Sequence, residues 1–118
     1  MSGEDYRESV QKLGSEFLEV PSRAWHNEGS NDYKNTYIDI VKIVDREGKE
    51  HDPVWGEEPV EVIPGVTTRK EDRGHLVRIA RGACPLRVLF REYFEYVSYD
   101  SWEHNSSWTS YWWIRYES

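Results

Sequence analysis

Residues 86–118, "LRVLFREYFEYVSYDSWEHNSSWTSYWWIRYES", decide the fold of this chain. Two runs rich in aromatic and β-branched residues flank the polar segment "EHNSS", and this composition is typical of two β-strands joined by a turn. The last twenty residues alone hold four of the six tryptophans. The segment therefore predicts a long aromatic hairpin at the C-terminal end.

A turn centred on Asn105 sets the expected register of this hairpin. Trp102 then pairs with Trp108, and Glu95 lies opposite Arg115. The remaining pairs are Tyr99 with Tyr111, Val97 with Trp113, Tyr96 with Ile114, and Phe94 with Tyr116. Aromatic and opposite-charge pairs across two strands each contribute roughly 0.2–1 kcal/mol, so the register is favourable.

The same register divides the hairpin into two faces, because successive side chains of a strand point to opposite sides. The first face is predicted to be core and carries Val88, Phe90, Phe94, Tyr96, Trp112, Ile114 and Tyr116. The second face mixes rings with charges and carries Leu89, Tyr93, Val97, Tyr99, Tyr111 and Trp113 with Arg87, Arg91, Glu95 and Arg115. Tyr, Trp and Arg are enriched at interfaces, so the second face is a candidate binding surface. The alternative is that its rings fill a core as well.

The N-terminal segment predicts a helix from about Asp5 to Leu18. Tyr6, Val10, Leu13 and Phe17 follow one another at the spacing of a single helical stripe. Glu4 and Asp5 suit a helix N-terminus, and Pro21 marks the end. We expect this helix to cover one face of the sheet.

The middle of the chain predicts further strands separated by loops. Residues 21–35 read as a loop, and "TYIDIVKIV" (36–44) reads as a strand, followed by a hairpin turn at Gly48 and a short return through His51. Val60–Ile63 reads as a strand closed by a Pro64-Gly65 turn, residues 67–74 as turn, and "HLVRIAR" (75–81) as a strand.

A helix followed by about six strands predicts an α+β fold, with the N-terminal helix packed on a curved, mainly antiparallel sheet. A β-sandwich or a partly open barrel with a peripheral helix is the alternative. The length of 118 residues predicts one domain, 1–118.

The charge is acidic overall but unevenly distributed. The net charge is -7, yet residues 69–91 hold seven basic and two acidic residues. The arginines predicted to lie on neighbouring strands, and so to converge on an anion such as a phosphate, are Arg78, Arg81, Arg87 and Arg91. The alternative is that they pair with the surplus carboxylates. The acidity of the rest of the chain argues against a nucleic-acid binder.

Catalytic and metal-binding patterns are absent from the sequence. The four histidines stand singly, without the spacing of a zinc site, and no cofactor motif occurs, so we expect no metal and no cofactor. His51 beside Asp52 is interpreted as a turn histidine. No apolar run suits a membrane span or a signal peptide, and the lone Cys84 suits a reducing compartment, so a cytoplasmic location is expected.

Three functions remain open. The leading hypothesis is a small acidic, non-enzymatic intracellular protein that docks on another protein with a basic surface, as an inhibitor, an immunity protein or a phage counter-defence factor does. The second is a small-molecule binder or enzyme with an aromatic and arginine pocket for an anionic, nucleotide-like ligand. The third is a structural subunit that assembles with copies of itself. The residues assigned to binding are Tyr93, Tyr99, Tyr111, Trp113, Arg78, Arg81, Arg87, Arg91 and Arg115.

Overall fold

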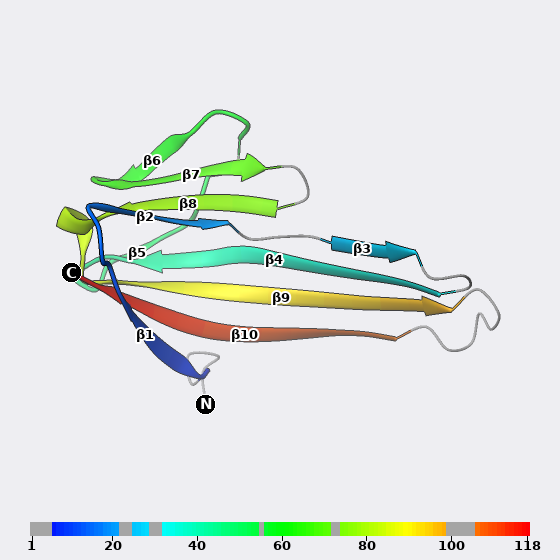
Figure 1. Ribbon diagram of the computed structural model, residues 1–118. Helices are drawn as coiled ribbons and strands as arrows, with labels where there is room; N and C mark the ends of the chain where they lie inside the picture. The colour runs from blue at the N-terminus through cyan, green and yellow to red at the C-terminus, as the bar shows by residue number, and fades with distance from the viewer. Residues whose placement is uncertain (1–5, 22–24, 29–31, 55, 72–73, 99–105) are drawn as a thin grey trace.

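A computed structural model of the protein describes residues 6–21, 25–28, 32–54, 56–71, 74–98 and 106–118. These residues form two β-sheets (Figure 1). Sheet A has the order β1 (Glu8–Lys12), β10 (Ser106–Glu117), β9 (Leu86–Ser98), β4 (Asp32–Val44) and β3 (Trp25–Glu28), and β5 (Glu50–His51) also pairs with β4. Sheet B has the order β2 (Phe17–Pro21), β8 (Gly74–Ala80), β7 (Val66–Glu71) and β6 (Val60–Ile63). Every pairing is antiparallel except that of β1 with β10.

Sheet B covers only one end of sheet A, as Figure 1 shows. We call the two-layer end the body. We call the remainder of sheet A the arm, which comprises residues 25–28, 32–39, 91–98 and 106–111. The molecule is accordingly elongated, with principal extents of 51 × 36 × 24 Å.

The main core fills the space between the sheets in the body. Sheet A contributes buried side chains that include Ile43 and Val88, and sheet B contributes Val66, Val77 and Ile79, all fully buried. Tyr116 of β10 is also fully buried, and its burial raises the pKa of the phenol well above the ordinary value. The first face of the hairpin is therefore core within the body, as the alternating pattern predicted.

The α+β prediction is wrong, because the N-terminal segment forms strands and not a helix. β1 and β2 lie at one edge of each sheet, and Leu13 between them is buried. Val10 and Phe17 of the supposed apolar stripe are 59% and 46% exposed. Backbone pairing with the edges of β10 and β8 satisfies this segment better than a helix interrupted at Gly14 would. Among the described residues the longest helical element is the 3-10 turn Arg81–Ala83.

Two segments expected to be loops are also strands. Residues 21–35 contain β3 and the beginning of β4, and residues 67–74 lie largely in β7. In β7, Val66 and Thr68 are buried while Thr67 between them is partly exposed. This alternation is the pattern of a strand, and the charges of Arg69 and Lys70 masked it. By contrast, Val60–Ile63 is confirmed as a strand, and β5 is as short as expected.

The C-terminal hairpin is confirmed, but its register differs from the expected one by eight residues. Trp108 pairs with Phe94, and Arg115 lies opposite Arg87 and not opposite Glu95. A turn sequence of five residues does not fix the register of a longer connection, here 99–105, which lies outside the described residues together with the expected partners Tyr99 and Trp102. Because eight is an even number, the division of β9 and β10 into two faces is unchanged.

Candidate binding surfaces

Trp113, a predicted binding residue on the second face, lies in a small second core of the body. Its side chain is 2% exposed and packs with Val44 and Leu89. The guanidinium of Arg87 lies 4.2 Å from the centroid of the indole ring, and Arg87 Nε donates a hydrogen bond of 2.7 Å to Glu8 Oε1. The ring of Trp113 is therefore not open to a partner in this structure.

Tyr111, another predicted binding residue, is partly covered by the N-terminal segment. The ring of Tyr6 stacks on the ring of Tyr111 with a centroid distance of 5.0 Å and an interplanar angle of 19°. Where the arm meets the body, Tyr6, which lies just before β1, therefore covers part of the second face.

Arg91 lies at the base of the arm, between Asp39 of β4 and Tyr111 of β10. Its Nη2 donates a hydrogen bond of 2.6 Å to Asp39 Oδ2, and this bond raises the pKa of the guanidinium. Asp39 Oδ1 lies 3.3 Å from Nδ1 of His75 on β8, whose pKa is lowered chiefly by burial. A hollow of about 380 Å³ opens here and is lined by Asp39, Arg91, Tyr93, Thr109 and Tyr111.

The structure does not bring the four arginines predicted to bind an anion into one site. Arg78 belongs to sheet B and lies 3.9 Å from Glu19, with its guanidinium over the ring of Phe17. Arg81 donates a hydrogen bond of 3.2 Å from Nη2 to the carbonyl oxygen of Leu13. Arg87 and Arg91 lie on the second face of sheet A and bond Glu8 and Asp39.

Arg115 and Tyr99 complete the predicted set of binding residues. Arg115 also lies on the second face, where its Nε is 3.0 Å from Glu117 Oε1. Of the predicted arginines, those that meet a carboxylate are Arg78, Arg87, Arg91 and Arg115. Tyr99 lies outside the described residues.

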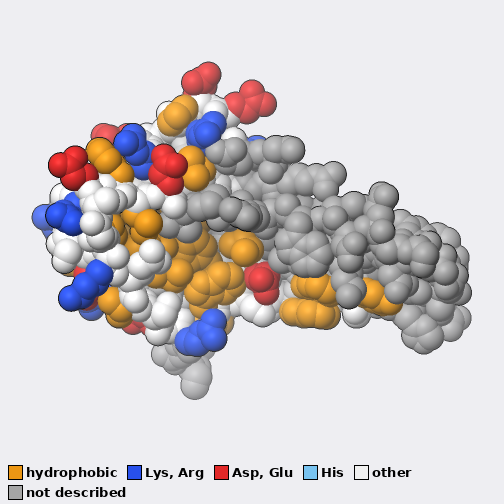
Figure 2. All heavy atoms as spheres, viewed as in Figure 1, with side chains coloured by type: hydrophobic (Ala, Val, Ile, Leu, Met, Phe, Trp, Pro, Cys, Tyr) orange, Lys and Arg blue, Asp and Glu red, His pale blue; other side chains and the backbone are white. Residues whose placement is uncertain are grey.

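Among the residues whose side chains are described, the largest exposed ring lies on the first face, where the sequence predicted core. Trp108 of β10 is 51% exposed and stacks on Phe94 of β9, with a centroid distance of 4.1 Å and an interplanar angle of 20°. Figure 2 shows hydrophobic side chains at the surface of the arm over the first part of β10. The sequence pattern did not reveal this surface, because it predicted the whole first face of the hairpin, Phe94 included, to be core.

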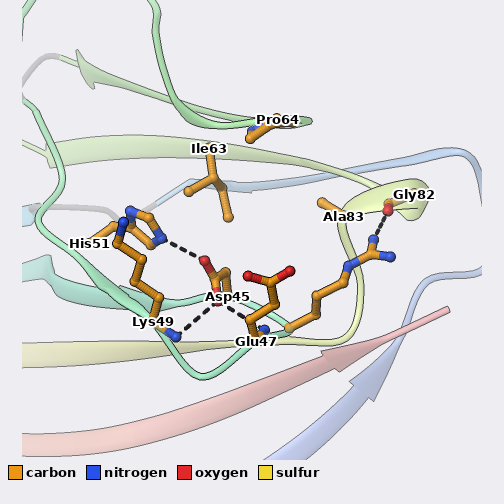
Figure 3. A pocket seen from close by; sticks show the side chains of 9 residues that line it. Asp45, Glu47, Lys49, His51, Ile63, Pro64, Gly82 and Ala83 are labelled. Carbon is orange, nitrogen blue, oxygen red and sulfur yellow. Dashed lines mark hydrogen bonds and ion pairs between the residues drawn. The ribbon is translucent and has the colours of Figure 1, made fainter.

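A cleft in the body was also missed. It lies between the β4–β5 turn and the β6–β7 turn, has a volume of about 390 Å³, and is drawn in Figure 3. His51 Nε2 is 2.8 Å from Asp45 Oδ2, while Oδ1 of Asp45 accepts hydrogen bonds of 2.9 Å from the backbone N–H groups of Glu47 and Lys49. The bond with His51 is the main cause of the lowered pKa of Asp45.

The position of Asp45 explains why the sequence did not reveal this pair. The partner of His51 is not the neighbouring Asp52 but a residue six positions earlier, brought close by the turn at Gly48. The same carboxylate closes the turn through backbone N–H groups, so the pair fixes the hairpin. The opposite wall, with Ile63 and Pro64, is apolar (Figure 3).

Two further features concern the metal-ligating residues and the cysteine of the described part of the chain. No three His, Cys, Asp or Glu residues there are grouped so as to hold a metal ion. Cys84 is buried, and its burial raises the pKa of the thiol, which disfavours the reactive thiolate. No helix among the described residues is long and apolar enough to cross a membrane.

Comparison with known proteins found no matching family model, no matching curated protein and no matching solved structure.

Proposed function

We propose that the protein is a non-enzymatic binding protein that docks on another protein through the arm. The observation that carries the proposal is the stacked pair of Phe94 and Trp108, with Trp108 51% exposed, on the part of sheet A that sheet B leaves uncovered. Trp is among the residues most enriched in the energetic centres of interfaces. A large ring kept half in solvent by a rigid strand pair is preorganised for burial against a partner.

The composition of the arm supports the same proposal. Eight of its 26 residues are aromatic, against 14% of the whole chain. It holds five acidic and two basic residues, and the sequence between β9 and β10 adds Asp100 and Glu103. An acidic composition rich in aromatic residues favours a partner with a basic surface, because opposite potentials steer the encounter.

A capture experiment tests this proposal with matched variants. Immobilised protein is exposed to a lysate of the source cells, and the captured proteins are identified and then titrated as purified partners. We expect Trp108→Ala and Phe94→Ala to weaken binding at least tenfold, which corresponds to about 1.4 kcal/mol. Phe17→Ala, which removes an exposed ring of sheet B, is the control and is expected to leave binding unchanged.

Two results would contradict the proposal. One is a partner that binds the arm variants and the wild type equally well. The other is the failure of capture and of cross-linking to return any protein other than this one. For a partner with a basic surface, binding is also expected to weaken as salt is added.

The hollow at the base of the arm favours a second candidate function, the binding of a small molecule. Tyr93 and Tyr111 line it together with Arg91, which is the combination expected for a ring with an attached anion. The bond between Arg91 and Asp39 neutralises much of that charge, so we rank this function second. A thermal-shift panel of nucleotides, phosphorylated sugars and organic acids tests it, and a flat panel would remove it.

A further inference from the structure

The outer edge of β10 is paired along only part of its length. β1 pairs with Trp113–Glu117, and among the described residues no strand pairs with the outer edge of Ser106–Ser110. All five of these residues are exposed. An unpaired strand edge presents backbone N–H and C=O groups to which another strand can pair.

This edge lacks the features that commonly prevent such pairing. Sheet edges are usually protected by lysines, prolines, bulges or short strands. Residues 106–114, "SSWTSYWWI", contain no charged residue, no proline and no glycine, although 31% of the chain is charged. Two copies can therefore align along this edge without placing like charges opposite each other.

We infer that a second copy of the chain pairs with this edge, antiparallel and symmetric about Trp108. The N–H of Trp113 points outward, because it donates a hydrogen bond of 2.8 Å to the carbonyl oxygen of Arg7. Backbone polar groups alternate sides along a strand, so those of Ser107 and Thr109 point outward as well. Ser107 of one copy then forms a hydrogen-bonded pair with Thr109 of the other, which yields about four new backbone hydrogen bonds.

The symmetric register also places Trp108 directly opposite Trp108 of the second copy. This is a non-hydrogen-bonded position, where opposing side chains come closest and aromatic pairs are stabilising. The edge that no described strand pairs with and the half-exposed ring are two separate observations, and the symmetric register uses both. Phe94 and Trp108 of the two copies would form one continuous aromatic row.

The inference deepens the proposed function, because the aromatic row of the dimer would enlarge the same docking surface. Only this role of the dimer in docking rests on the proposed function; the dimer itself does not. The edge itself is uncharged over residues 106–114 and so can pair with an identical strand without opposing charges, whereas the acidic residues elsewhere in the two arms repel each other. Self-association should accordingly tighten as salt rises from about 0.05 M to about 0.5 M, the opposite of docking on a basic partner.

Sedimentation velocity of the full chain over a wide range of concentration tests the dimer. We expect a monomer–dimer equilibrium, with a dimer dissociation constant raised at least about tenfold by Thr109→Pro, which removes an outward N–H. Thr109→Ala keeps that N–H and is the control. Trp108→Lys, which places like charges opposite each other without changing the backbone, is expected to abolish the dimer even if Thr109→Pro fails to fold.

The register is tested by intermolecular disulfides. Ser106 of one copy lies opposite Ser110 of the other in a non-hydrogen-bonded pair, so the double variant Ser106→Cys/Ser110→Cys is expected to form a covalent dimer under mild oxidation. Ser106→Cys alone and the wild type, whose Cys84 is buried, are expected not to do so.

Two results would overturn the inference. In one, the wild type stays monomeric at every protein and salt concentration; in the other, the Trp108→Lys variant still forms the dimer. Either result leaves the capture experiment valid, because a monomer can still dock through Phe94 and Trp108. Loss of capture with an intact dimer would remove the proposed function and keep the inference.

Discussion

Phe90 and Phe94 lie on the same face of β9, and each stacks on a tryptophan of β10, yet one pair is core and the other is surface. Phe90 is 2% exposed and stacks on Trp112 in the body. Phe94 stacks on Trp108 in the arm, where Trp108 is 51% exposed. The sequence pattern is the same in both places, and the difference is whether sheet B lies above it (Figure 1). A buried stripe thus becomes a candidate binding surface where the second layer ends.

Phe90→Ala is expected to reduce stability more than any substitution in the arm. Removing a ring that is 2% exposed leaves a cavity between the two sheets and should lower the free energy of unfolding by about 3–5 kcal/mol. Urea denaturation followed by circular dichroism measures it, and Phe94→Ala is the comparison. If both variants lost the same stability, the distinction between body and arm would be wrong.

Gly65→Ala is expected to have the next largest effect, because Gly65 lies where the β6–β7 turn packs closely against the end of β8. Its φ is +86°, and an added Cβ would lie 3.2 Å from the Cβ atoms of Ala80 and Ala83. We expect a loss of about 1–3 kcal/mol in the free energy of unfolding. Gly48→Ala is the control, since Gly48 has a φ of +84° with no atom within 4 Å of the added Cβ. Both glycines have a positive φ, so the difference between the stability losses of the two variants measures the cost of the close contacts at Gly65. Equal losses would show that these contacts do not affect stability.

Whether a sequence prediction was confirmed depended on how far apart in the sequence the interacting residues lie. The hairpin turn at Gly48 and the strand Val60–Ile63 are set by local chemistry and were predicted. The two faces of β9 and β10 depend only on the alternation of side chains, so they survived a register error of eight residues. The N-terminal helix failed because edge pairing with β10 and β8, which is distant in sequence, outweighed a local apolar stripe.

The candidate site was less predictable, since it depends on where one layer ends. Arg87, Arg91, Tyr93, Tyr111 and Trp113 were correctly placed together on the second face. Nothing in the sequence pattern of these residues shows that Trp113 is only 2% exposed. Its burial depends on the packing of Arg87 and other side chains around the ring, which the fold determines. The exposure of Trp108 was not visible either, because the extent of sheet B is a property of the whole fold.

Trp108→Ala is expected to cost little stability in spite of the size of the ring. About half of the side chain is already in water, so the main loss is its stacking on Phe94, about 0.5–1.5 kcal/mol. A denaturation midpoint close to that of the wild type, together with weaker capture of the partner, would support a surface role. A loss as large as that of Phe90→Ala would place Trp108 in a core and contradict the assignment of the arm.

The smallest expected effect is a pH dependence at His75, where sheet B meets the base of the arm. Burial lowers the pKa of His75 below its ordinary value of 6.5, with Lys70 and Arg91 acting in the same direction and Asp39 opposing them. The folded state therefore favours the neutral ring, whereas the unfolded chain takes up a proton as the pH falls below about 6.5. The contribution of His75 to the free energy of unfolding is therefore fully present above about pH 6.5. It declines below that pH, until the folded protein also binds the proton.

His75→Gln removes this proton uptake, and so the decline between neutral and mildly acidic pH should be shallower in the variant than in the wild type. Urea denaturation at a series of pH values measures the two slopes, and their difference isolates His75 from the other histidines. Identical slopes would mean that the pKa of His75 is the same in the folded and unfolded states, and would contradict the pKa shift expected from its burial. A shallower slope in the variant would agree with burial of the His75 ring where it lies 3.3 Å from Asp39, between β8 of sheet B and β4 of sheet A.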